Sequence, residues 1–107
     1  MTSTKRITSR DNAFYKTLHK LASSTRARRE VGQTLLDGPH LLRAYLETGH
    51  QPLHLLLNEH AIQDAEINAL LETCNGVPQT QLDDVLFAQL SELKTPNGLL
   101  AVIPVPQ

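Results

Sequence analysis

The stretch GLLAVIPV, residues 98–105, is the clearest indication of the fold class of this chain. It follows the turn sequence Thr95-Pro96-Asn97-Gly98 and is apolar throughout, as expected for a strand that is buried on both faces. PLHLLL, residues 52–57, is a second nearly continuous apolar run. Two such runs predict a sheet with helices on both sides, because a strand with one face in water alternates polar and apolar residues.

Helical and strand patterns alternate along the rest of the chain. Strands are expected at 34–36 and 77–81, and helices over 12–23, 39–48, 61–74 and from 84 onward, with a short helix or loop over 23–32. Ser9 or Asp11 is the expected cap of the first helix. This order predicts an α/β fold: a three-layer α/β/α sandwich with a four-stranded, mostly parallel sheet.

Length and composition set the class of protein. A chain of 107 residues with 40% hydrophobic and 20% charged residues is typical of one compact globular domain. No run of about 18 apolar residues is present, and the first ten residues lack the apolar core of a secretory signal. Cys74 is the single cysteine, so we expect no disulfide within the chain and a cytoplasmic location.

Charge is distributed very unevenly. Residues 1–30 contain eight of the ten basic residues and two acids, a net charge of +6. Residues 31–107 contain two basic residues and nine acids, a net charge of −7. A basic segment on an otherwise acidic protein predicts one surface that faces a polyanion, rather than general attraction to anions.

The basic residues of this segment follow a helical pattern. Phe14, Leu18 and Leu21 share one face of the expected 12–23 helix, which leaves a basic opposite face. The candidate contacts to a polyanion there and in the next stretch are Arg10, Asn12, Lys16, Lys20, Arg26, Arg28 and Arg29. Lysine and arginine can neutralise phosphates, and arginine also stacks on unpaired bases. A solvated helix back is the plain alternative, and Asn12 could equally be a residue that starts the helix.

A set of motifs occurs in a fixed order: ITSRDNAFYKTLHKL at 7–21, Arg28, Gly32, LLDG at 35–38 and TPNGLLAV at 95–102. Together they resemble the N-terminal substrate-binding domain of SpoU-type (TrmH-type) RNA 2′-O-ribose methyltransferases of the SPOUT superfamily, over residues 7–104. The resemblance implies a fold like that of the ribosomal proteins that bind kink-turn RNA, and it implies rRNA or tRNA as the partner. Two departures are Ala13, where the family commonly has proline, and Asp37, where it usually has glutamate.

The resemblance also implies a domain organisation. Residues 1–32 would form a basic helical segment of the same domain as the α/β part, 33–104, and residues 105–107 would begin a linker. A catalytic domain that binds S-adenosylmethionine and forms a homodimer would lie outside this chain. The chain itself would then hold no cofactor or metal, would have no activity alone and could be monomeric.

Two further segments have both a functional and a structural interpretation. Asp37-Gly38 follows an expected strand, where α/β proteins often place functional groups, but a helix-capping carboxylate beside a turn glycine is the favoured interpretation. Lys94 precedes the turn at 95–98 and could contact RNA, although a plain turn explains that segment as well.

Metal and thiol chemistry are not indicated. His50 and His54 are four residues apart, but Pro52 and the apolar run prevent a helix from aligning them. Cys74 has no basic neighbour in the sequence, so we expect a buried or unreactive thiol. Three hypotheses remain: an RNA-binding domain of a methyltransferase, a free-standing RNA-binding protein of the kink-turn type, and a protein-interaction module.

Overall fold

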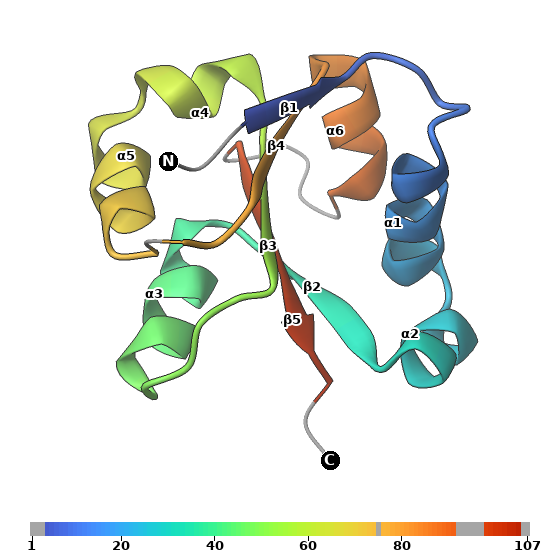
Figure 1. The fold of residues 1–107 in the computed structure, drawn as a ribbon, viewed down its shortest axis with the longest axis horizontal. Coiled ribbons are helices and arrows are strands. Elements are labelled where there is room, and N and C mark those ends of the chain that lie inside the picture. Colours follow the sequence, from blue (N-terminus) through green and yellow to red (C-terminus); the bar gives the residue numbers. More distant parts are fainter. Residues whose placement is uncertain (1–3, 75, 92–97, 106–107) are drawn as a thin grey trace.

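The computed structural model describes residues 4–74, 76–91 and 98–105 (Figure 1). Its elements follow in the order β1 (Thr4–Ile7), α1 (Ala13–Ser23), α2 (Thr25–Val31), β2 (Gln33–Asp37), α3 (Pro39–Glu47), β3 (His54–Leu57), α4 (Glu59–Gln63), α5 (Ala65–Glu72), β4 (Gln79–Leu82), α6 (Asp84–Leu90) and β5 (Leu99–Pro104). The alternation of helices and strands predicted from the sequence is therefore present. No helix among these residues is both long and apolar enough to cross a bilayer.

The strands form one mixed sheet in the order β1-β4-β3-β5-β2. β1 and β3 each pair parallel with β4, while β5 pairs antiparallel with both β3 and β2. Strands β1 to β4 thus run in one direction, and β5 lies reversed between β3 and β2. The prediction of a four-stranded, mostly parallel sheet is wrong in the number of strands. In the observed sheet, half of the strand pairs are antiparallel.

The extra strand is β1, which the sequence does not reveal. Its four residues, TKRI, include two cations, and they pair with Gln79–Leu82 at the edge of the sheet. Ile7 is its buried apolar residue, so the apolar pattern that marks a strand is missing. An edge strand tolerates such a sequence because only one of its sides pairs with a neighbour.

The register shows where β5 enters the sheet. Asp37, the last residue of β2, pairs with Leu100, and Leu57, the last residue of β3, pairs with Leu99. The first residues of β5 thus lie beside the last residues of its two neighbours, so β5 runs antiparallel to both.

Helices cover both faces of the sheet, so the predicted three-layer arrangement is confirmed. Helices α1, α2 and α6 lie on one side and α3, α4 and α5 on the other (Figure 1). Residues of β5 alternate between the two cores: Leu100 and Val102 pack on the α1–α6 side, and Leu99 and Ala101 on the α3–α5 side. Apolar residues are required on both faces, which explains the uninterrupted run seen in the sequence.

One local detail differs from the sequence-based expectation, and one agrees with it. The helix expected over 61–74 is two helices, because Asp64 ends α4 and begins α5 by accepting a hydrogen bond from the Ile67 amide at 3.1 Å. Cys74 is buried, as expected, and burial raises the pKa of its thiol. A buried thiol with a raised pKa is a poor nucleophile.

Gly98 allows a test of the packing where β5 begins. Its φ is +86°, and a Cβ there would lie 2.7 Å from Oδ1 of Asn58, the atom that caps α4 by accepting from the Ala61 amide. Gly49 has the same φ of +86° with nothing within 4 Å. Gly49→Ala should cost about 1 kcal/mol of unfolding free energy for the backbone strain alone. Gly98→Ala should cost about 1 kcal/mol more, because the cap is also displaced.

Urea denaturation of the two variants beside the unmodified chain measures this difference. Equal losses for Gly49→Ala and Gly98→Ala would mean that the Asn58 cap tolerates the added methyl group.

Candidate RNA-binding surface

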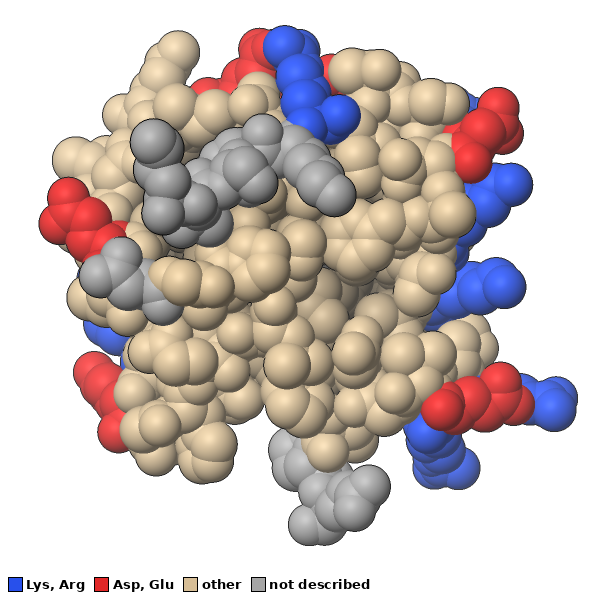
Figure 2. All heavy atoms as spheres, in the orientation of Figure 1, with Lys and Arg blue, Asp and Glu red and all other residues tan. Residues whose placement is uncertain are grey.

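The outward face of α1 presents a group of cations. Tyr15, Leu18 and Leu21 are buried against the sheet, which turns Lys16 and Lys20 toward solvent. Arg10 lies just before the helix and lines the same surface hollow as these two lysines. Figure 2 shows lysine and arginine side chains along the side of the molecule where α1 and α2 lie. We call Arg10, Lys16 and Lys20 the α1 cation group.

Tyr15 fixes the orientation of this face. Its side chain is buried, and its hydroxyl oxygen lies 2.8 Å from the Leu86 carbonyl oxygen and 3.2 Å from Oε1 of Gln89 on α6. Burial raises the pKa of Tyr15, and the positive charge of Arg10 partly opposes that shift. The hydroxyl therefore stays protonated at neutral pH and holds α1 against α6.

Helix α2 extends the cationic side. Arg26 and Arg29 are both exposed. Arg26 donates from Nε to Oε1 of Glu30 at 3.0 Å, but both side chains are well exposed, so this pair adds little stability and can open readily. The structure records no ion pair for Arg29 with any of the described residues. Two further cations are thus available beside the α1 cation group.

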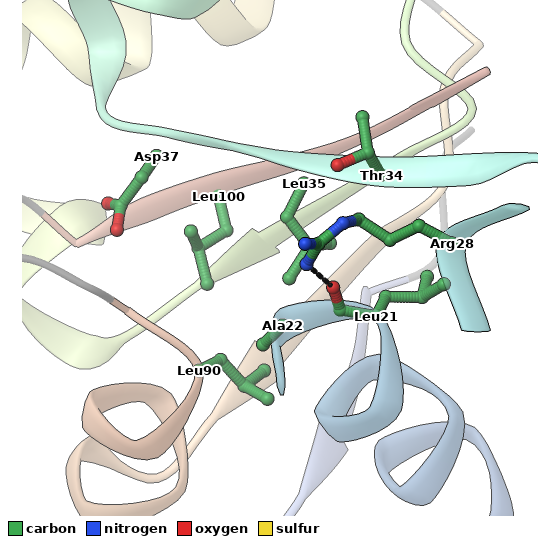
Figure 3. Close-up of a pocket in the computed structure, with 8 residues that line it drawn as sticks. All are labelled: Leu21, Ala22, Arg28, Thr34, Leu35, Asp37, Leu90 and Leu100. Atoms are coloured by element: carbon green, nitrogen blue, oxygen red, sulfur yellow. Dashed lines mark hydrogen bonds between the residues drawn. The ribbon is translucent and has the colours of Figure 1, made fainter. Parts of the chain in front are cut away.

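Arg28 differs from its neighbours because it points inward. It is half-buried, Nη1 donates to the Leu21 carbonyl at 2.7 Å, and Nη2 donates to Oγ1 of Thr25 at 3.0 Å. The Leu21 carbonyl belongs to the last turn of α1, where carbonyl groups lack partners within the helix. Arg28 therefore joins the end of α1 to α2, and its guanidinium lines a pocket rather than the outer basic face (Figure 3).

Asn12 has a clear local role. It is the N-cap of α1, and its Oδ1 accepts from the Tyr15 amide at 3.1 Å. The cap predicted at Ser9 or Asp11 is therefore one to three residues too early; the Ser9 hydroxyl instead accepts from the Asp11 amide at 3.1 Å. The structure thus supports the helix-start interpretation of Asn12, and a contact between its exposed side chain and RNA stays a prediction.

Asp37 does not cap the following helix. Gly38 is the N-cap of α3 and makes no side-chain hydrogen bond. Instead, Oδ2 of Asp37 accepts from the Ser91 hydroxyl at 2.7 Å, which connects the end of β2 to the end of α6. Asp37 also lines the pocket that contains Arg28. Lys94 lies outside the described residues.

Several residues near this surface are not among the candidate contacts named from the sequence, although His19 falls on the basic face expected for the first helix. His19 and Gln89 line the same hollow as the α1 cation group. Arg6 lies where β1 ends and donates to Glu59 at 3.0 Å, with Asp83 at 3.5 Å. These partners are far away in the sequence, so no local pattern marks them.

Two of the histidines, His50 and His54, are engaged in other contacts. Nδ1 of His50 lies 2.8 Å from Oγ1 of Thr48, and Nε2 of His54 lies 2.6 Å from Oγ1 of Thr80. Over residues 4–74, 76–91 and 98–105, the fold brings together no group of three or more histidine, cysteine, aspartate or glutamate side chains that could hold a metal ion.

A three-layer α/β domain with cations concentrated on one helical side belongs to the class of small domains suited to bind a polyanion. Residues 12–101 match the family model described as the MRM3-like substrate binding domain, so this chain belongs to that family. The membership agrees with the resemblance found in the sequence motifs. A comparison with curated proteins found no match.

Solved structures share the fold at low sequence identity. An rRNA methyltransferase from Sinorhizobium meliloti matches with a TM-score of 0.72 and 16% identity over 96% of this chain and 38% of its own. An RNA 2′-O ribose methyltransferase matches with a TM-score of 0.81 and 21% identity over 95% of this chain and 38% of its own. The SpoU methyltransferase AviRb from Streptomyces viridochromogenes matches with a TM-score of 0.73 and 21% identity over 89% of this chain and 34% of its own. This chain thus spans less than two fifths of the length of each of these proteins.

The cap at Asn12 can be tested apart from any RNA contact. Asn12→Ala should lower the unfolding free energy by about 1 kcal/mol, because the Tyr15 amide loses its acceptor. Asn12→Asp keeps an acceptor oxygen and adds a negative charge at the helix N-terminus, so it should retain the stability. Urea titrations of both variants provide the measurement, and equal losses would show that the missing acceptor is not their cause.

Proposed function

We propose that this chain is the RNA-binding, substrate-recognition part of an RNA 2′-O-ribose methyltransferase that acts on rRNA or tRNA. The observation that carries the proposal is the cationic side formed by α1 and α2 on a domain of the MRM3-like substrate binding family. The solved relatives, an rRNA methyltransferase and an RNA 2′-O ribose methyltransferase among them, support an RNA substrate.

The chemistry of the surface suits recognition of an RNA backbone. Lys16 and Lys20 lie one helical turn apart, about 6 Å along the axis of α1, and Arg10 lines the same hollow. Their ammonium and guanidinium groups can contact phosphates, which fixes position on the RNA without reading sequence. Exposed cations in such an arrangement can recognise the shape of an RNA backbone as well as its charge.

In this proposal, a catalytic domain outside this chain carries out the methyl transfer. Relatives solved with bound AdoMet support S-adenosylmethionine as the methyl donor of the parent protein. We propose that the catalytic domain also forms the homodimer and that the parent acts in the cytoplasm. The role of the present residues is then to hold the RNA, with no part in the transfer itself.

Electrostatic binding predicts a strong dependence on salt. The logarithm of the affinity for a labelled RNA hairpin should fall linearly with the logarithm of salt concentration. The double variant Lys16→Ala and Lys20→Ala should reduce that slope by about 1.4, at about 0.7 for each lost phosphate contact on unpaired RNA. Fluorescence anisotropy over a salt series measures both quantities.

Arg43→Ala is the matched control, since it removes a cation from α3 on the opposite face, where Arg43 pairs with Glu66 at 3.1 Å. This variant should keep the original slope. RNA binding that ignores salt and the lysine substitutions would overturn the proposal. Binding to an acidic protein that RNA does not displace would favour an interaction module instead.

A further inference from the structure

The hollow that contains the α1 cation group also contains an aromatic ring and an amide. It lies between α1 and α6, which cover the same face of the sheet (Figure 1). Its volume is about 410 Å³, within the range of about 300–1,000 Å³ that is typical of sites for small ligands. The lining residues other than the three cations are Tyr15, His19 and Gln89. The hollow therefore offers more than positive charge.

The side chains of α1 follow one another around the helix from the interior to the solvent. At about 100° per residue, His19 lies about 40° around the helix from Tyr15. Lys16 and Lys20 lie further round, at about 100° and 140° from Tyr15. Tyr15 is buried, whereas the other three residues are exposed. The imidazole ring thus lies between the packed interior of the hollow and its charged outer margin.

Tyr15 supports both of the uncharged groups from beneath. The ring centroids of Tyr15 and His19 are 6.4 Å apart, with the ring planes tilted by 49°. Oε1 of Gln89 lies 3.2 Å from the hydroxyl oxygen of Tyr15. A glutamine amide has two N–H donors and an oxygen with two lone pairs, so one contact to a hydroxyl leaves capacity for a ligand. The exposed ring and the exposed amide are therefore held in place without being used up.

We propose that this hollow binds one unpaired nucleotide of the RNA, an inference that rests on the proposed function. The base stacks on the exposed ring of His19, because every base has a π-face that an aromatic side chain can contact. The amide of Gln89 hydrogen-bonds to the edge of the base. The α1 cation group contacts the phosphates on either side of it.

A paired duplex cannot fill the hollow in this way. Its bases face one another inside the helix, so it offers phosphates and sugars to the three cations and no base to the ring. Stacking is also tolerant of sequence, because it needs only the flat face of a base. The hollow therefore gives the domain a preference for loops and bulges over paired RNA, without a strong preference for one base.

The test compares three RNA duplexes with the same paired sequence. One is fully paired, one has a single extra unpaired nucleotide, and one has an abasic residue at that extra position. By fluorescence anisotropy, the unmodified chain should bind the bulged duplex about ten-fold tighter than the paired duplex, in line with the contribution of one stacked base. The abasic duplex should bind like the paired one, because it keeps the phosphates and lacks the base.

Substitutions of His19 test the stacking itself. His19→Ala should abolish the preference for the bulged duplex, and His19→Phe should keep it, because phenylalanine also offers a ring. His60→Ala is the matched control, since it removes an exposed histidine from α4 on the other face of the sheet, and it should leave the preference unchanged. Loss of the preference in folded His19→Phe would overturn stacking as its cause.

Two further variants separate the base contact from the phosphate contacts. Gln89→Ala should weaken the preference, whereas Gln63→Ala, at an exposed position of α4, should not. The double variant Lys16→Ala and Lys20→Ala should weaken the binding of all three duplexes by a similar factor. Its preference for the bulged duplex should therefore remain.

The remaining outcomes distinguish this inference from the proposed function. A preference that the abasic duplex shares would mean that the bend of the RNA is recognised instead of its base. That result, equal binding of all three duplexes, or a preference that survives in folded His19→Ala would overturn the nucleotide site and leave the proposed function standing. Failure of the unmodified chain to bind any of the three duplexes would overturn both.

Discussion

Strand β5 is the element on which both cores depend. Its backbone pairs with β2 on one side and β3 on the other, and its side chains alternate between the two helical layers. Without β5, strand β2 would have no neighbour in the sheet, and each core would lose part of its wall. Helix α1 keeps its place over this face because Leu100 and Val102 complete the apolar surface beneath it.

Buried and half-buried residues orient the two helices that form the charged side of the molecule. Tyr15 orients α1 through α6, and Arg28 then orients α2 through the last turn of α1. A half-buried arginine with these hydrogen bonds mainly fixes the position of the two helices, and its positive charge is secondary. The exposed cations around it are less constrained, so they can follow an irregular phosphate backbone. A rigid inner residue beside adaptable outer ones suits the RNA contact that we propose for this surface.

Much of this arrangement could be predicted from the sequence, for identifiable reasons. Long apolar runs and turn glycines mark β3 and β5, and the spacing of Leu18 and Leu21 marks the inner face of α1. Tyr15, rather than the partly buried Phe14, is the fully buried aromatic residue there, because its hydroxyl finds partners on α6 that the sequence does not show. The direction of β5 could not be predicted either, because the alternation of helices and strands predicts the layers but not the order or direction of the strands. Likewise, no local signal distinguishes the inward Arg28 from Arg26 or Arg29.

The position of β5 also has a consequence for how the protein is made. Residues 99–104 lie between strands that are synthesised much earlier, at 33–37 and 54–57. The nascent chain can form its helices and the β3–β4 pair while it is still being extended, but β2 must wait for β5 to leave the ribosome. Until then its apolar residues have no sheet to join, because among the described residues β2 pairs with β5 and with no other strand. The sheet is thus completed late, by β5, the strand that the amino-acid sequence predicts most clearly.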